Sequence, residues 1–177
     1  MLRSMKYIGN IFWLSLFVCL ASAQNDTVPN TWLGVWKLNA AKSSFDERTL
    51  VKITDQTLTI SATQKELTIM GDTTLPDGRR VAETSKVQLD GTETVVAANV
   101  IASFKRIDDR SFELTITARI PAGIGIGVNR FVFSSDGKTL TETKTQTLRA
   151  AVPKGNDPEK AAVIRTSKSV LVFEKQK

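Results

Sequence analysis

Histidine is absent from this sequence of 177 residues, and cysteine and tyrosine each occur once. Without histidine there is no Ser-His-Asp or Cys-His catalytic set, no imidazole base near neutral pH, and no histidine ligand for a metal or a haem. No spacing of carboxylates singles out the pair that glycosidase chemistry needs, and no Asp-rich calcium loop occurs. We therefore expect a protein that is not an enzyme, with no catalytic residue, metal or cofactor.

Cysteine is confined to position 19, inside an apolar N-terminal stretch. Val18 precedes it where a lipoprotein signal has a small residue, so Cys19 reads as an ordinary signal residue. The chain after the signal then has neither disulfides nor thiolate zinc sites. About 154 residues remain, enough to bury roughly 68–70% of the unfolded surface.

A secretory signal is predicted over residues 1–23. Arg3 and Lys6 form a basic start, Tyr7–Leu20 is mostly apolar, and the Ala-Ser-Ala that follows has the small-x-small form of a cleavage site. The apolar stretch is shorter than the roughly 20 residues of a membrane span, so we expect no stable membrane anchor after cleavage; a retained anchor is the alternative. Residues 24–177 are expected to form a single domain. Export without disulfides favours a periplasmic or secreted bacterial protein.

The formal charge of +6 falls to about +4 once the two basic residues of the signal are removed. The remaining basic residues are scattered, without interleaved aromatic residues. A nucleic-acid surface requires clustered charge, so we expect no nucleic-acid partner.

Short runs of alternating apolar and polar residues fill the rest of the chain, with turn signals such as Asp90-Gly91 and Asp136-Gly137 between them. This pattern is typical of an all-β sandwich or barrel. The clearest run is Phe112–Ile120, with one apolar and one polar face. The predicted strands are 32–38, 50–60, 66–75, 79–89, 93–97, 100–107, 111–120, 126–134, 138–148 and 163–174.

Three segments allow more than one interpretation. The threonines at every second position of 139–147 either reflect strand propensity or line a partly polar barrel interior. The glycine-rich segment 121–127 is not a dinucleotide fingerprint, because Val128 stands where the third glycine belongs, and we expect a flexible apolar hairpin loop there. A second long loop is expected over 150–162.

Gly34-Val35-Trp36, early on the first predicted strand, resembles the lipocalin signature. Trp36-Lys37-Leu38 followed by Phe45-Asp46-Glu47 is similar to the start of fatty-acid-binding proteins, which belong to the same calycin superfamily. The segments 34–39, 41–43, 104–108 and 135–141 resemble uncharacterised secreted bacterial proteins, many from acidobacteria, that are often called lipocalin-like.

The resemblance implies structural roles for Gly34 and Trp36: the glycine at a barrel corner, and the indole plugging the closed end beneath a basic side chain. The candidates for that basic side chain are Lys175, Arg165 and Lys168. Fatty-acid-binding proteins capture the carboxylate with an Arg-x-Tyr in the last strand. The matching positions hold Leu171 and Phe173, so fatty-acid binding is not carried over.

The expected fold is an antiparallel, up-and-down β-barrel of about eight to ten strands, lipocalin-like in form. The expected function is non-catalytic binding of a small apolar or amphipathic molecule. The alternatives are a filled barrel that serves as a structural or protein-interaction module and, third, an enzyme on a calycin scaffold with a buried, perturbed carboxylate. The candidate ligand-binding residues are the apolar, inward-facing positions Leu58, Ile60, Phe112, Leu114, Ile116, Phe131, Phe133, Leu171 and Phe173.

Overall fold

The computed structural model describes residues 27–48, 53–121, 123–150 and 162–177. The predicted signal and nearly all of the predicted 150–162 loop lie outside these ranges. The described elements are β1 (Gly34–Leu38), the 3-10 helix η1 (Ala40–Lys42), β2 (Asp55–Ala62), β3 (Glu66–Thr74), β4 (Arg80–Gln88), β5 (Thr94–Ala97), β6 (Val100–Asp108), β7 (Ser111–Ile120), β8 (Gly123–Phe133), β9 (Thr139–Ala150) and β10 (Val163–Lys175). Among these residues, no helix has the length and apolar character needed to cross a membrane.

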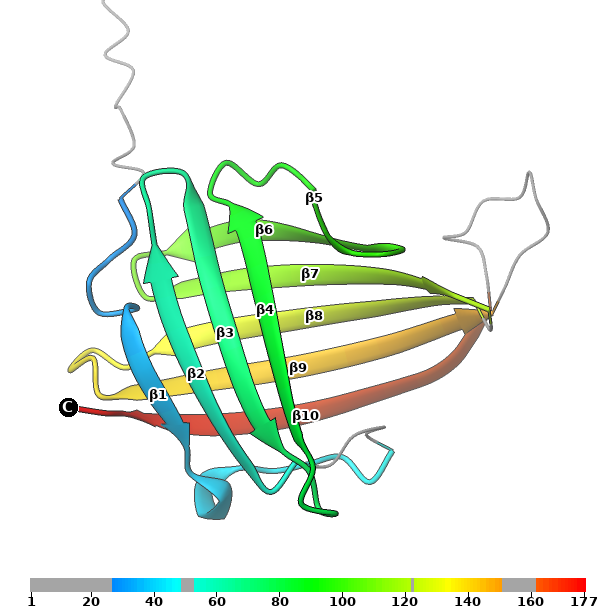
Figure 1. Ribbon diagram of the computed structural model, residues 1–177, viewed down its shortest axis with the longest axis horizontal. Helices are drawn as coiled ribbons and strands as arrows, with labels where there is room; N and C mark the ends of the chain where they lie inside the picture. The colour runs from blue at the N-terminus through cyan, green and yellow to red at the C-terminus, as the bar shows by residue number, and fades with distance from the viewer. Residues whose placement is uncertain (1–26, 49–52, 122, 151–161) are drawn as a thin grey trace, which may run out of the picture.

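The strands form one sheet of 10 strands in the order β4-β3-β2-β1-β10-β9-β8-β7-β6-β5. Strands that follow one another along the chain pair antiparallel, except β4 and β5, and β1 also pairs with β10, with Trp36 opposite Lys175. This pairing joins the two ends of the meander. In Figure 1, β1–β4 cross steeply over strands β6–β10. The prediction of an all-β, antiparallel, up-and-down barrel is confirmed, and the barrel is nearly closed, since β4 and β5 end the ladder.

The apolar core gathers at one end of the barrel. Trp32, Trp36, Phe112, Phe133 and Phe173 are fully buried there, and they come from both ends of the chain and from its middle. Strand alternation produces this core, because residues two apart point to the same face. The inward positions of β7 and β8 at this end carry bulky apolar side chains.

Two predicted boundaries differ for physical reasons. The first strand begins at Gly34 rather than at residue 32, because Trp32 lies in a turn in which its amide donates to the Pro29 carbonyl. The predicted loop over 121–127 is wrong for most of its length, because β8 begins at Gly123. The glycines there pair with both β7 and β9, and two flanking ladders outweigh the weak strand propensity of glycine.

Candidate functional site

The predicted Gly34–Trp36 motif lies at the packed end of the barrel. The Trp36 indole donates from Nε1 to the Trp32 carbonyl at 3.0 Å, and the ammonium of Lys175 lies 5.0 Å from its ring centroid. Gly34 has φ +123, and a Cβ there would lie 3.2 Å from Lys175 Cε. Of the three basic candidates, Lys175 is the one that covers this tryptophan. The motif therefore closes the barrel end.

Trp32 enlarges this closure, although the resemblance gave it no role. Its ring stacks on Phe133 at 5.5 Å and packs against Phe112 at 4.8 Å, and its Nε1 donates to the Asp109 carbonyl at 3.0 Å. The Arg106 guanidinium lies 5.6 Å from the ring centroid. We call this region, from Trp32 and Trp36 to the phenylalanines of β7 and β8, the packed half.

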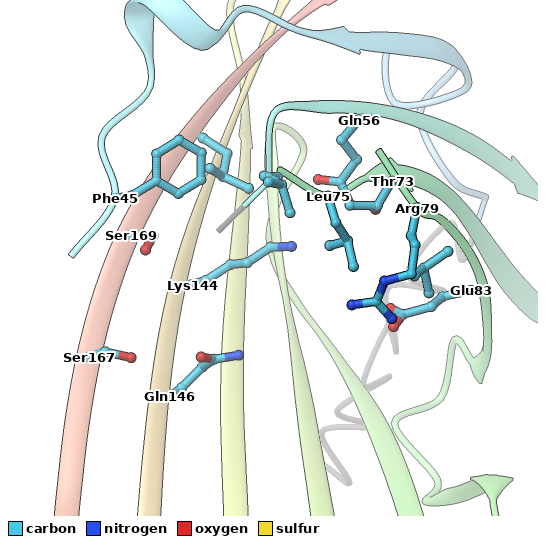
Figure 2. A pocket seen from close by; sticks show the side chains of 13 residues that line it. Phe45, Gln56, Thr73, Leu75, Arg79, Glu83, Lys144, Gln146, Ser167 and Ser169 are labelled. Carbon is cyan, nitrogen blue, oxygen red and sulfur yellow. The ribbon is translucent and has the colours of Figure 1, made fainter. Parts of the chain in front are cut away.

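The other end of the barrel is hollow. A cavity of about 440 Å³ lies between β2–β4 on one side and β9–β10 on the other. Figure 2 shows side chains from both walls pointing into it. A smaller cavity of about 330 Å³ lies toward the far ends of β7–β10 and shares Glu83, Lys144, Gln146 and Ser167 with the first. The two cavities are adjoining parts of one interior, which we call the hollow half.

A loop before β2 frames one edge of the larger cavity. Ser44 forms an isolated bridge with Val170 of β10, with N–O distances of 2.7 and 2.8 Å in the two directions. The bridge fixes the next residue, Phe45, whose ring lines the cavity (Figure 2). The pattern Phe45-Asp46 thus has a structural counterpart at the cavity edge.

Strand β9 presents its mixed face to the interior. Leu140 and Glu142 are buried, while Lys144 and Gln146 line the cavities farther along the same face. Among the alternate positions of β9, Thr147 lines the smaller cavity, and its hydroxyl lies 3.4 Å from that of Thr166 on β10. The other threonines of this strand line neither cavity, so a threonine-lined interior is found at Thr147 alone. A charge on the inner face is tolerated here because the space beside it is not filled.

Glu142 lies at the boundary between the two halves and is 2% exposed. Its Oε2 is 3.4 Å from Lys144 Nζ. Burial raises the pKa of the Glu142 carboxyl above its ordinary value, and the nearby positive charge of Lys144 offsets only part of that rise. Glu142 lines neither cavity; Lys144 does, from the same strand face.

Gln56 provides a second polar group on the opposite wall. Its side chain is nearly buried, at 7% exposed, and lines the larger cavity. The amide Nε2 donates to Thr73 Oγ1 at 2.9 Å, whereas Oε1 has no hydrogen-bond partner. An acceptor buried without a donor costs free energy, so this oxygen marks a place for a donor.

The candidate ligand-binding residues divide between the two halves. Ile116 lines the smaller cavity and Leu171 lines the larger one. The others are buried in the packed core: Leu58, Ile60, Phe112, Leu114, Phe131, Phe133 and Phe173. That any of them contacts a ligand stays a prediction.

Sequence reasoning missed the polar lining. The inner faces of β9 and β10 carry polar residues next to the apolar residues that were predicted to bind the ligand. These polar residues are Lys144, Gln146, Arg165, Ser167 and Ser169. The available signal was the change of residue type along one face, from Phe173 and Leu171 to serines two and four residues earlier. Polar residues on an otherwise apolar face indicate space beside them.

Together these features define a class: a nearly closed antiparallel barrel, filled at one end and hollow at the other, compatible with a calycin-type, lipocalin-like fold. No protein-family model matches the chain, and no curated protein matches it.

Proposed function

We propose that this protein binds a small amphipathic molecule in the hollow half of the barrel, without catalysing a reaction. The observation that carries the proposal is the cavity of about 440 Å³, whose lining combines apolar side chains such as Phe45 and Leu171 with polar ones such as Gln146 and Ser167. This volume falls within the roughly 300–1,000 Å³ of typical small-molecule sites, and a lining with both apolar and polar side chains suits a molecule that has both kinds of surface.

The filled-barrel alternative has less support. A structural or interaction module with a solid barrel predicts an interior without space, and the described interior has two adjoining cavities. The packed half shows that large aromatic side chains can fill the end of a barrel of this size. The cavities in the hollow half therefore result from the smaller and polar side chains on its inner faces.

The enzyme alternative rests on one residue. Glu142 is a buried carboxyl with a raised pKa, which is the feature that acid–base chemistry would need. The Glu142 side chain lines neither cavity. The charged residue on the inner face of β9 that lines both cavities is Lys144. A general acid must come within hydrogen-bond reach of its substrate, so this placement favours binding over catalysis.

We also propose that the protein is exported and is a lipocalin-like member of the calycin superfamily, on the predicted signal and the resemblance at Gly34–Trp36. N-terminal sequencing of the protein from periplasmic and culture fractions tests the first point. Recovery of an uncleaved chain in the membrane fraction alone would contradict it.

Native mass spectrometry of gently purified protein, with extraction and identification of any bound molecule, tests the binding function. We expect a complex with an added mass of one small molecule, and saturable uptake of a hydrophobic dye. A Gly127→Val variant, which places a side chain at the wall of the smaller cavity, should bind less. Absence of both a co-purified molecule and a saturable dye site would contradict the proposal.

A further inference from the structure

Two polar groups in the hollow half can bind a ligand: the cationic side chain of Lys144 and the acceptor oxygen of Gln56. Lys144 presents its ammonium to both cavities, and its ion pair among the described residues is with Glu142 at 3.4 Å. Gln56 offers an acceptor, because its Oε1 has no hydrogen-bond partner although the side chain is nearly buried. Both residues line the larger cavity, from opposite walls (Figure 2).

Positive charge dominates the deep wall. Lys144 on β9 and Arg165 on the neighbouring β10 both line the smaller cavity. The buried carboxyl of Glu142 lines neither cavity. Glu83 on β4, an exposed residue at the edge of the sheet, lines both cavities and is the one carboxylate among the described lining residues, against the two cations of each cavity. Arg79 lines the larger cavity and is paired with Asp77 at 2.6 Å.

Apolar surface lies on the other side of these groups. Ile116, Ala118 and Ile120 of β7 and Leu148 of β9 line the smaller cavity, beside Gly125 and Gly127, which leave its wall open. An apolar chain fits against this wall while a polar end lies between Lys144 and Gln56.

We propose that the ligand is an acidic amphiphile whose polar end carries two groups: an anionic group that Lys144 binds, and a neighbouring hydroxyl or N–H that donates to Gln56 Oε1. Hydroxylated or N-acylated long-chain acids have this chemistry. The inference rests on the proposed function and names the polar end of its ligand.

Isothermal titration calorimetry of the purified protein with four probes of equal chain length tests this: dodecanol, dodecanoate, 3-hydroxydodecanoate and dodecylammonium. We expect dodecanoate to bind about 10-fold tighter than dodecanol, since a charge-assisted hydrogen bond is worth about that factor or more. The hydroxylated acid should gain roughly another 3- to 10-fold from Gln56. Dodecylammonium should bind weakest.

Variants separate the two contacts. Removing Lys144 alone would leave the buried Glu142 carboxyl without its ion pair, so Glu142→Gln is the background variant. The Glu142→Gln protein should still bind dodecanoate more tightly than dodecanol. The double variant Glu142→Gln, Lys144→Met should lose this preference. Gln56→Met should abolish only the advantage of the hydroxyl. Lys168→Met, an exposed lysine on β10, is the matched control and should change nothing. If the double variant does not fold by circular dichroism, the order of the four probes on the wild type still tests the anionic group, and Gln56→Met still tests the hydroxyl.

The outcomes distinguish the two proposals. If dodecanol and dodecanoate bind equally, or dodecylammonium binds best, the acidic headgroup is wrong while binding of an amphiphile stands. If the hydroxyl brings no gain, the role of Gln56 is wrong. If none of the four probes binds, the proposed function itself falls.

Discussion

The packed half and the hollow half share strands β7–β10, and along these strands they differ in the side chains on the inner face. On β8, Phe131 and Phe133 are buried in the packed half, whereas Gly125 and Gly127 line the smaller cavity. On β10, Phe173 gives way to the inward Ser167. The backbone ladder is continuous across this change. Space in this barrel is therefore set by side-chain volume, while the strands themselves supply the frame.

Truncating the packed half should have the largest effect. Trp36→Ala removes a fully buried indole, its contact with Phe133 at 5.3 Å between ring centroids, and its hydrogen bond to Trp32. Loss of a buried aromatic side chain costs about 3–5 kcal/mol. We expect urea denaturation to show a loss of that size.

The matched variant in the hollow half is Leu148→Ala. Leu148 is half-buried at a cavity wall, so its truncation enlarges an existing space and should cost about 1 kcal/mol. Equal losses in the two variants would contradict the division of the barrel into a packed and a hollow half.

Much of the frame could be predicted from the sequence, because alternation and turn residues are local signals. Each of the ten described strands overlaps a predicted one. The cavity could not be predicted in this way, because the same alternation marks an inward position whether it meets a packed neighbour or open space. Ile116 and Phe112 share one face of β7, and only the opposing residues decide that the first lines a cavity.

The polar residues that line the cavity were not predicted from the sequence. Lys144 and Gln146 looked like solvent-facing residues on a strand with two polar faces. Which face points inward depends on register with β8 and β10, where Lys144 lies opposite Asn129 and Ser169. Those partners lie 15 and 25 residues away along the chain, so the alternation around Lys144 carries no signal of this register.

The next largest effect should be a dependence of the free energy of unfolding on pH, caused by Glu142 at the boundary between the two halves. The folded chain holds the Glu142 proton at a pH where the unfolded chain, with an ordinary pKa near 4.5, has lost it. The native state then binds more protons, so the contribution of Glu142 to stability is full below pH 4.5 and falls as pH rises toward the raised pKa. The fall is about 1.4 kcal/mol for each pKa unit of the rise.

Urea titrations across this pH range, with the wild type and Glu142→Gln compared at each pH, measure the effect. Exposed acids such as Asp77 and Asp136 have lowered pKa values, and their contributions run the other way, being lost as pH falls. They are common to both proteins and cancel in the difference. A difference that does not change with pH would contradict a raised pKa for Glu142.

Removing the cation that covers Trp36 should have a smaller effect on the packed half. Lys175→Met keeps the aliphatic stem and removes the ammonium that lies 5.0 Å from the ring centroid and donates to the Thr31 carbonyl at 3.3 Å. We expect a loss of about 0.5–1 kcal/mol in thermal or urea unfolding. Lys168→Met, on the outer face of the same strand, is the control. A loss as large in the control would show that general charge, rather than the indole, is responsible.

The smallest change in stability should come from filling the hollow half. Gly127→Val builds a side chain where a Cβ would lie 3.9 Å from the Ile116 carbonyl, an ordinary contact, and it replaces glycine in a strand. We expect stability to rise by about 0.5 kcal/mol, because glycine within a strand costs about 0.5–1 kcal/mol.

Gly34→Ala is the contrasting variant: with φ +123 and Lys175 Cε only 3.2 Å from the added carbon, it should lose stability instead. If Gly127→Val is more stable and also binds the dye more weakly, the open wall of β8 is kept for ligand binding at a cost in stability. A variant that is more stable and binds unchanged would place the ligand outside the smaller cavity, against the lining of the larger one alone.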